Sequence, residues 1–329
     1  MQSAPRRRID EVDTLTASRA ALVLGLGLCA TPTVAQYPER AIEFVIPFDA
    51  GGSADIEGRL LAEEMSAELG VTMVPVNRPG AGGALAYTYV NEADPDGYTV
   101  MWTSTSILTI TNLGNVPFGF DALDHIGRVE HQPLVIAVAA DSPWSDIESL
   151  ARDCAGSDRP VRVANSGTGS ATHLGALAIM QAIGCEAVHL PIGTRRRNAT
   201  VLSGEADAMV APLTGALSLF RAGRLQLPAS LGAERNSIIP DVPTARELGM
   251  DVEFDLFRGL SVPRGTPADV QARLAEAMTR AASSEAFQRL ADDLGLTVAP
   301  LTMDPFETLL QQENDKVSSI IQGADTLTR

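Results

Sequence analysis

Short apolar runs alternate with amphipathic stretches through most of the 329-residue chain, and this pattern constrains the fold more than any other feature. Residues 42–47 form an apolar run of strand length, and the apolar side chains of residues 54–69 recur with a helical period. The run 134–140 is continuously apolar, as expected of a strand that is covered on both faces. Such alternation predicts an α/β architecture with largely parallel sheets.

The same pattern gives the other expected elements, without an internal repeat. Further strands are expected at 71–76 and 98–103, near Val161, Ala187, Ala206 and Leu225, and in the extended run 252–263. Further helices are expected at 81–92, from about Ser145, Ser170, Arg195 and Leu213, and at 267–282, 284–294 and 304–322. A chain of this length is enough for about two domains.

Charge and composition exclude several classes of protein. The chain has 25 Lys and Arg against 41 Asp and Glu, a formal net charge of −16. A nucleic-acid-binding protein needs a basic surface to neutralise phosphates, so we expect no nucleic-acid partner. Lys316 is the single lysine of the sequence, and neither a phosphate-binding loop nor a Schiff-base motif surrounds it.

Residues 1–35 have the composition of a secretory signal peptide. Three arginines occupy positions 6–8, an apolar stretch covers 20–30, and Thr33, Val34 and Ala35 provide small residues for cleavage. We therefore expect export to the periplasm. Leu28 is bulky where a lipid-modified cysteine is preceded by a small residue, which argues against lipidation of Cys29. No later segment reaches the about 18 apolar residues of a membrane span.

Cys154 and Cys185 are the two cysteines that remain after removal of such a signal. Each follows an expected helix and precedes an expected strand, so both should lie at the same edge of a parallel sheet. An oxidising compartment permits a disulfide between them. Two separate buried thiols fit the sequence equally well.

Three turns that follow expected strands have the composition of an anion site. In open α/β sheets, ligands bind beyond the carboxyl ends of the strands, where loops lead into helix N-termini. The first turn, 47–55, contains Gly51 and Gly52, and the second, 165–173, contains Gly167 and Gly169. The third is the run of hydroxyl side chains 103–106. Free amides, hydroxyls and helix N-termini together suit a small carboxylate.

Other chemistries fit these turns poorly. The 167–169 loop lacks the third glycine of a dinucleotide-binding loop, and 80–83 reads as a structural turn. Ser170 and His173 are the one tempting nucleophile–base pair, but at a helix start they indicate a turn and a packed histidine. The four histidines and the cysteines lack the spacing of metal ligands. We expect no catalysis, no metal and no cofactor.

The order of these motifs brings a resemblance. The chain is similar to the extracytoplasmic solute receptors of tripartite tricarboxylate transporters, the Bug family. The segments that carry the resemblance are Tyr37-Pro38, 47–59 with Asp55 and Arg59, 77–83, 95–99, 166–174, 240–249 and 259–267. They cover nearly all of the chain that follows the signal peptide.

The resemblance implies a class II periplasmic-binding-protein fold, with two lobes, a hinge and an interlobe ligand cleft. Residues 36–137 and 259–329 would form lobe 1 and residues 138–258 lobe 2, joined by crossing segments near 134–141 and 254–263. A small carboxylate would be held in the cleft by Phe48, Gly51, Gly52, Ser53, Asp55, Ser166, Thr168, Gly169, Ser170 and Thr172. Thr103, Ser104 and Thr105 are secondary candidates. The implied protein is a monomer that delivers its ligand to the membrane permease subunits of the transporter.

Three departures from the family pattern bear on the cleft. Asp49 stands in the first loop, where its charge would oppose an anion unless the side chain points away. After Pro191 a family tyrosine is absent, and Arg195, Arg196 and Arg197 follow. We favour a solvated helix start for this arginine cluster over a charge supply to a di- or tricarboxylate. Phe257 replaces a frequent tryptophan.

Three function classes follow from the residues and the resemblance. A periplasmic receptor that delivers a small organic carboxylate to a transporter is the leading interpretation. An exported sensor that signals to a membrane histidine kinase is the first alternative, and an exported hydrolase is the weaker one. The sequence does not identify the carboxylate.

Overall fold

The computed structural model describes residues 37–156 and 159–327. The expected signal peptide at 1–35 and Cys29 lie outside the described residues. The strands are β1 (Ile42–Ile46), β2 (Met73–Asn77), β3 (Thr99–Ser104), β4 (Leu123–Ala139), β5 (Val161–Asn165), β6 (Ala187–Pro191), β7 (Ala208–Pro212), β8 (Leu225–Ser230), β9 (Asp255–Pro263) and β10 (Thr297–Thr302). The helices are α1 (Ser53–Leu69), α2 (Ala84–Asn91), α3 (Ser106–Asn112), α4 (Ile147–Gly156), α5 (Ala171–Ala182), α6 (Gly193–Leu202), α7 (Leu213–Arg221), α8 (Ala268–Ala282), α9 (Glu285–Leu294) and α10 (Asp304–Leu327), with short 3-10 turns η1 (Ala81–Gly83) and η2 (Phe120–Ala122).

The strands follow one another in the order β2-β1-β3-β9-β4-β7-β5-β6, and β8 and β10 also pair with β4. Strand β1 is parallel to β2 and β3, and β5 is parallel to β6 and β7. The pairs that involve β4, and the β3–β9 pair, are antiparallel. The α/β class is confirmed, but the expectation of largely parallel sheets is wrong at the centre, where β4 and β9 run against their neighbours.

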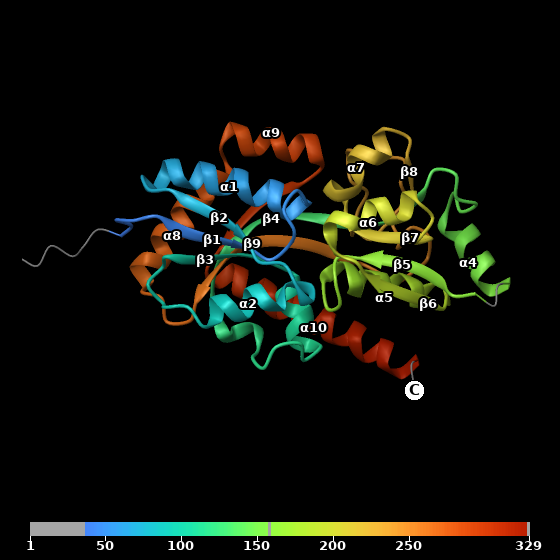
Figure 1. The fold of residues 1–329 in the computed structure, drawn as a ribbon, viewed down its shortest axis with the longest axis horizontal. Helices are drawn as coiled ribbons and strands as arrows, with labels where there is room; N and C mark the ends of the chain where they lie inside the picture. The colour runs from blue at the N-terminus through green and yellow to red at the C-terminus, as the bar shows by residue number, and fades with distance from the viewer. Residues whose placement is uncertain (1–36, 157–158, 328–329) are drawn as a thin grey trace, which may run out of the picture. The chain divides into compact units, whose positions relative to one another are not determined.

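Strand β4 joins two groups of strands. Its residues 123–133 pair with β9, and its residues 134–139 pair with β7 and β8. We call β1–β3, β9, β10 and the start of β4 the first half, and β5–β8 with the end of β4 the second half (Figure 1). The predicted lobe boundaries, 137/138 and 258/259, fall inside β4 and β9, and the lobe assignment itself stays a prediction.

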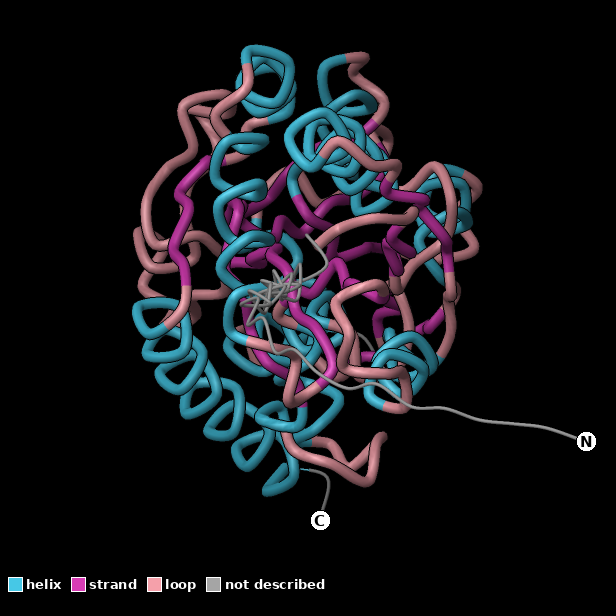
Figure 2. The backbone as a smooth tube through the Cα atoms, turned by 90° about the vertical axis from the view of Figure 1, so that its left-hand side faces the viewer, coloured by secondary structure: helices cyan, strands magenta, loops and turns pink. Residues whose placement is uncertain are grey.

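Helices cover both faces of each half (Figures 1 and 2). Helices α1, α8 and α9 pack on one face of the first half and form one core with it. Helices α6 and α7 pack on one face of the second half and form a separate core there. The remaining core contains residues of α2, α3, α5 and α10 and continues across both halves, because α10 contacts both α3 and α5. Strand residues alternate between the cores: Phe44 and Ile46 face α1, whereas Val45 faces the other side.

Tertiary context explains the elements that the sequence pattern missed. Helix α3 has the β-branched composition of a strand, but all its residues from Ser106 to Ile110 are fully buried, so packing overrides propensity. Strand β10 contains Pro300 and pairs with β4 through a register shift, as a proline-containing edge strand must. The expected helix 81–92 is interrupted at Gly82, whose φ of 68° is incompatible with an α-helix.

Cys154 and Cys185 form a disulfide with a Cα–Cα distance of 5.3 Å. It links the last turn of α4 to the segment between α5 and β6, and β5 and β6 are parallel neighbours as the spacing predicted. The sequence was compatible with a disulfide and with two separate thiols, and the structure contains the disulfide. Within the described ranges, no helix is both long and apolar enough to cross a membrane.

Candidate functional site

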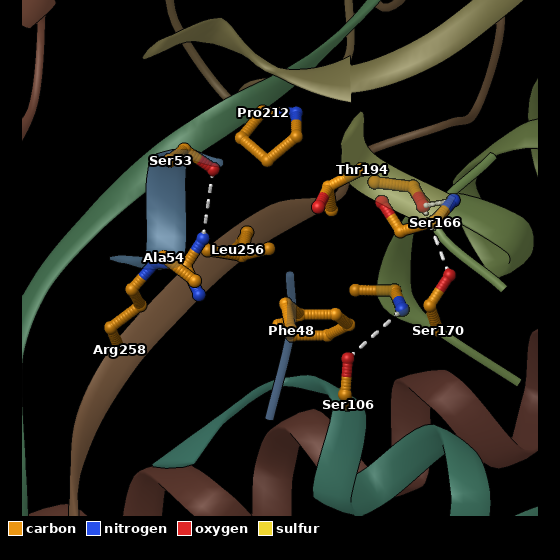
Figure 3. Close-up of a pocket in the computed structure, with 12 residues that line it drawn as sticks. Phe48, Ser53, Ala54, Ser106, Ser166, Ser170, Thr194, Pro212, Leu256 and Arg258 are labelled. Atoms are coloured by element: carbon orange, nitrogen blue, oxygen red, sulfur yellow. Dashed lines mark hydrogen bonds between the residues drawn. The ribbon is translucent and has the colours of Figure 1, made fainter. Parts of the chain in front are cut away.

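A small cavity lies where the N-terminal ends of α1 and α5 approach each other across the two halves (Figure 3). The residues that line it are Phe48, Ser53, Ala54, Ser106, Ser166, Ser170, Ala171, Thr172, Thr194, Pro212, Leu256 and Arg258. Its volume is about 10 Å³, which is room for about one water molecule. Arg258 is the one charged side chain among these lining residues, and none of them is Asp or Glu.

The first loop presents a helix N-terminus to this cavity. Helix α1 begins at Ser53 after Gly52, and no side chain caps it, so the amide groups of its first turn have no side-chain partner. Phe48, Ser53 and Ala54 line the cavity from this loop. A helix N-terminus with free N–H groups favours an anion.

Asp55 stabilises the first loop and does not line the cavity. Its carboxylate accepts hydrogen bonds from the Gly51 amide at 2.8 Å, from Arg59 Nε at 2.7 Å and from Asn77 Nδ2 at 2.9 Å. Burial raises the pKa of Asp55, but the hydrogen bonds from Arg59, Gly51 and Asn77 outweigh it and lower the pKa. The loop is therefore held by an ionised carboxylate that is not part of the cavity wall.

Asp49 does not line the cavity, but its carboxylate binds Thr194, which does. Its Oδ2 accepts from the backbone N and from Oγ1 of Thr194, each at 3.2 Å. Asp49 thus caps the start of α6 from the opposite half of the molecule. A Cβ built on Gly52 would lie 2.9 Å from Thr194 Oγ1, so the small size of Gly52 allows this contact between the halves.

The second loop positions several hydroxyl groups. Ser170 is the N-cap of α5 and accepts from the His173 amide at 3.2 Å, and its hydroxyl lies 2.9 Å from that of Thr172. Thr172 Oγ1 accepts from the Ser166 amide at 2.9 Å. Ser106, from α3, accepts from the Ala171 amide at 3.3 Å (Figure 3). These bonds hold serine and threonine side chains from both halves around one cavity.

Thr168 and Gly169 of the second loop contact the first half instead of the cavity. The Thr109 hydroxyl donates to the carbonyl of Gly169. A Cβ built on Gly82 would lie 2.4 Å from the carbonyl oxygen of Thr168. The 80–83 turn and the second loop therefore meet backbone to backbone.

The hydroxyl run 103–105 is used inside the first half. Thr103 Oγ1 lies 3.1 Å from the Tyr87 hydroxyl, which also accepts from the Ser104 amide at 2.9 Å. Thr105 Oγ1 accepts from the Phe257 amide at 3.0 Å. None of the three lines the cavity, whereas the next residue, Ser106, does. The hydroxyl run 103–106 therefore reaches the cavity through Ser106, and the role of Thr103, Ser104 and Thr105 in ligand binding stays a prediction.

Arg258 is the charged residue of the cavity wall, and the sequence did not predict it. It is 1% exposed, its Nη2 donates to Ser53 Oγ at 3.2 Å, and its Nε forms an ion pair with Glu57 and lies 3.6 Å from Glu130 Oε1. Burial, and then the neighbouring Glu57 carboxylate, raise the pKa of Glu130 well above its usual value. Glu57 is the nearer of the two carboxylates to the Arg258 guanidinium.

Strand alternation could have identified Arg258 once β9 was known. Successive side chains of a strand face opposite sides, so Leu256 and Arg258 line the cavity while Phe257 faces the other side. The Phe257 ring packs on Phe306 with centroids 5.5 Å apart. The frequent tryptophan position is therefore not part of this cavity wall.

The arginine cluster divides in two. Arg195 and Arg196 are exposed, as expected for a solvated helix start, but Arg197 is 2% exposed. Arg197 Nη1 donates to Ser166 Oγ at 2.8 Å, and Ser166 lines the cavity. The helical period turns one of the three side chains inward, which three consecutive letters do not reveal.

Ser170 and His173 do not form a nucleophile–base pair. Ser170 Oγ accepts from the backbone of His173, while the ring Nδ1 of His173 accepts from the Gly169 amide at 3.2 Å. The ring packs on His189 with centroids 5.1 Å apart. Burial and, after it, His189 lower the pKa of His173 to about 4. Among the described residues, no group of His, Cys, Asp and Glu is arranged to hold a metal ion.

Of the expected ligand residues, the structure gathers five around the cavity. These five are Phe48, Ser53, Ser166, Ser170 and Thr172. The loops beside the cavity contain five more of the expected residues, Gly51, Gly52, Asp55, Thr168 and Gly169. The last three, Thr103, Ser104 and Thr105, bond to residues inside the first half. Residues outside the expected set, such as Thr194, Pro212 and Leu256, complete the wall from α6, β7 and β9.

Comparison with known proteins gives a consistent result. A family model described as "Tripartite tricarboxylate transporter family receptor" matches residues 58–325. Protein BugT of Bordetella pertussis is 26% identical over 303 residues, which are 90% of this chain and 93% of BugT. The solved periplasmic binding protein BugD is 29% identical with a TM-score of 0.82, over 88% of this chain and 99% of BugD. MatC from Rhodopseudomonas palustris, solved with bound malate, is 27% identical with a TM-score of 0.81, over 87% of this chain and 100% of MatC.

Proposed function

Because the chain belongs to the tripartite tricarboxylate transporter receptor family, we propose that it is a periplasmic receptor which binds a small organic carboxylate between its two halves and delivers it to the permease of such a transporter. The family is one of solute-binding receptors and not of enzymes.

The composition of the cavity wall is the observation that carries the proposal. The wall contains the N-terminal ends of α1 and α5, hydroxyl side chains from both halves and the buried guanidinium of Arg258, and no carboxylate. Helix N-termini, hydroxyls and guanidinium groups all donate hydrogen bonds, and donors of this kind stabilise an anion. The similar protein MatC was solved with bound malate, which is a small carboxylate anion.

The size of the cavity supports binding by closure. A volume of about 10 Å³ is too small for malate, so we propose that the halves separate to admit the ligand and close over it. Separation would break contacts that now join the halves: Asp49 with Thr194, Thr109 with Gly169, and Ser106 with Ala171. The chain passes between the halves at β4 and near the start of β9, which would serve as the hinge.

A ligand panel tests the receptor function. The protein is unfolded and refolded to remove any bound metabolite, and its melting temperature is then measured with malate and other mono-, di- and tricarboxylates. We expect at least one acid to raise the melting temperature, since a ligand that binds the native state stabilises it by mass action. No shift with any organic acid, together with turnover of an ester or glycoside, would contradict the proposal.

Two substitutions test whether the cavity is the binding site. Ser170→Ala removes a lining hydroxyl, and Gly52→Val places a side chain against Thr194, whose Oγ1 would be 2.9 Å from the new Cβ. Both should weaken binding of the stabilising acid. Ser319→Ala, on the exposed face of α10, is the matched control and should bind normally. Normal affinity in both cavity variants would place the ligand elsewhere.

Delivery to a permease needs a separate measurement. A strain that lacks the receptor gene should lose uptake of the radiolabelled acid, and the wild-type gene should restore it. Restoration by the Ser170→Ala variant, at an acid concentration that this variant does not bind, would show that delivery does not depend on the cavity.

A further inference from the structure

Arg197 is a buried cation without an anionic partner among the residues that the structure describes. It is 2% exposed, no carboxylate within those residues forms an ion pair with it, and its Nε has no hydrogen-bonding partner there. Its guanidinium lies against Gly215 of α7, where a Cβ would be 2.7 Å from Nη2. An uncompensated buried charge is unfavourable in a folded protein, so its position calls for a partner other than the residues that the structure describes.

Burial and the nearby Arg258 guanidinium lower the pKa of Arg197 to about 10. Arg197 is therefore still protonated at neutral pH. Arg258 is balanced by Glu57, and Glu130 beside it has a raised pKa. Within the described part of the chain, the positive charge of Arg197 has no carboxylate in an ion pair with it, and Arg197 touches the cavity wall through Ser166.

Each of the two guanidinium groups donates to a serine that lines the cavity. Arg197 Nη1 donates to Ser166 Oγ at 2.8 Å, and Arg258 Nη2 donates to Ser53 Oγ at 3.2 Å (Figure 3 shows the second). Ser106 Oγ accepts likewise, from the Ala171 amide at 3.3 Å. A hydroxyl that accepts from a cation or an amide keeps its own hydrogen free to donate. Each of the three serines can therefore donate a hydrogen bond to a ligand in the cavity.

We propose that Arg197, acting through Ser166, and Arg258, acting through Ser53, orient two serine hydroxyls as donors to one carboxylate of the ligand, so that the site takes organic acids without an ammonium group and rejects the corresponding amino acids. This inference rests on the proposed function and names the ligand class. An ammonium group would find no carboxylate among the lining residues. It would lie beside the Arg258 guanidinium, and the Arg197 guanidinium is bonded to the lining Ser166. Arg197 is a positioning residue, since it reaches the cavity only through Ser166.

Matched pairs of acids test the ligand class. Calorimetric titration compares succinate with aspartate, glutarate with glutamate, and adipate with 2-aminoadipate. For the chain length that binds, we expect the plain diacid to bind at least tenfold more tightly than its amino analogue. An amino acid that binds as tightly as its diacid would overturn the proposal while leaving the receptor function intact. Absence of binding by any carboxylate would overturn both.

Variants on α6 test the role of Arg197. Arg197→Met should weaken binding of the diacid at least tenfold, and Arg197→Lys, which keeps the charge, should recover part of the loss. Arg195→Met removes an exposed arginine of the same helix and should bind as wild type. Without ligand, Arg197→Met should melt no lower than wild type, because it removes an uncompensated buried charge. Normal diacid affinity in Arg197→Met, or a lower melting temperature with unchanged affinity, would show that Arg197 is merely structural.

Discussion

Replacement of Gly82 by alanine should separate the cost of closing the two halves from the cost of folding. Gly82 has φ = 68°, and a Cβ there would lie 2.4 Å from Thr168 O, 2.7 Å from Ser170 N and 2.9 Å from Gly169 C. All three atoms belong to the backbone of the second loop, so no side chain can rotate out of the way. Since ordinary contact begins near 3.4 Å, the loops would have to separate by about 1 Å.

Two free-energy costs follow from this geometry. A non-glycine residue in the left-handed region costs about 1 kcal/mol whether the halves are open or closed. The overlap with the second loop costs about 1–3 kcal/mol, as in overpacked cores, but only when the halves are closed. If ligand is bound only in the closed form, Gly82→Ala should weaken binding by about 1–3 kcal/mol, which is roughly 5- to 150-fold.

Gly70→Ala is the matched control. Gly70 ends α1 with φ = 75°, and a Cβ there would have nothing within 4 Å, so only the backbone cost applies. Calorimetric titration with the acid that best stabilises the wild type, and urea unfolding, measure affinity and stability in parallel. Both variants should lose at least about 1 kcal/mol of unfolding free energy, and only Gly82→Ala should lose affinity. Equal affinity in Gly82→Ala and wild type would refute binding by closure.

Three other perturbations have expected outcomes. Reducing the Cys154–Cys185 disulfide, which spans 31 residues, should lower the unfolding free energy by about 3–4 kcal/mol, as measured by urea unfolding with and without reductant. Two free thiols in unreduced, unfolded protein would contradict the disulfide. His173 has a folded pKa of about 4, below its unfolded value of about 6.5, so its contribution to the unfolding free energy is complete above pH 6.5 and falls by roughly 2–3 kcal/mol as the pH decreases toward 4. Parallel curves of unfolding free energy against pH for wild type and His173→Gln would refute this contribution. Glu57→Gln removes the carboxylate that pairs with buried Arg258 and should cost about 3 kcal/mol of unfolding free energy. This is the low end for a broken buried pair, because Glu130 ionises more readily once Glu57 is neutral and can then pair with Arg258. An unfolding free energy equal to that of wild type would contradict the role of the ion pair.

The local signals of the sequence identified the parts of the fold that depend on neighbouring residues. The period of apolar residues identified α1 and β1 within one or two residues, because amphipathic helices and buried strands repeat at fixed intervals. Turn composition placed Ser53, Ser166 and Ser170 in the turns that lead from strands into helices, and these three line the cavity. The spacing of Cys154 and Cys185 allowed the disulfide that the structure contains.

Long-range packing decided what those signals left open. The sequence treats Thr103, Ser104 and Thr105 like the other hydroxyls. In the structure the Thr103 hydroxyl bonds with Tyr87, and the other two accept from the amides of Ser106 and Phe257. The sequence also gives Arg195, Arg196 and Arg197 equal weight, although one of them is buried. Burial of a charged side chain depends on which other elements cover it, and that information is absent from a local window.

The sequence by itself determined the α/β class, the two glycine-rich loops and the helix starts that line the cavity, because each depends on residues close together in the chain. Only the tertiary structure decided the charge of the site. Arg258 reaches Ser53 across 205 positions and Arg197 reaches Ser166 across 31. Such partners meet only when strands distant in sequence pair and helices pack upon them, so the electrostatics of the cavity are a property of the folded chain.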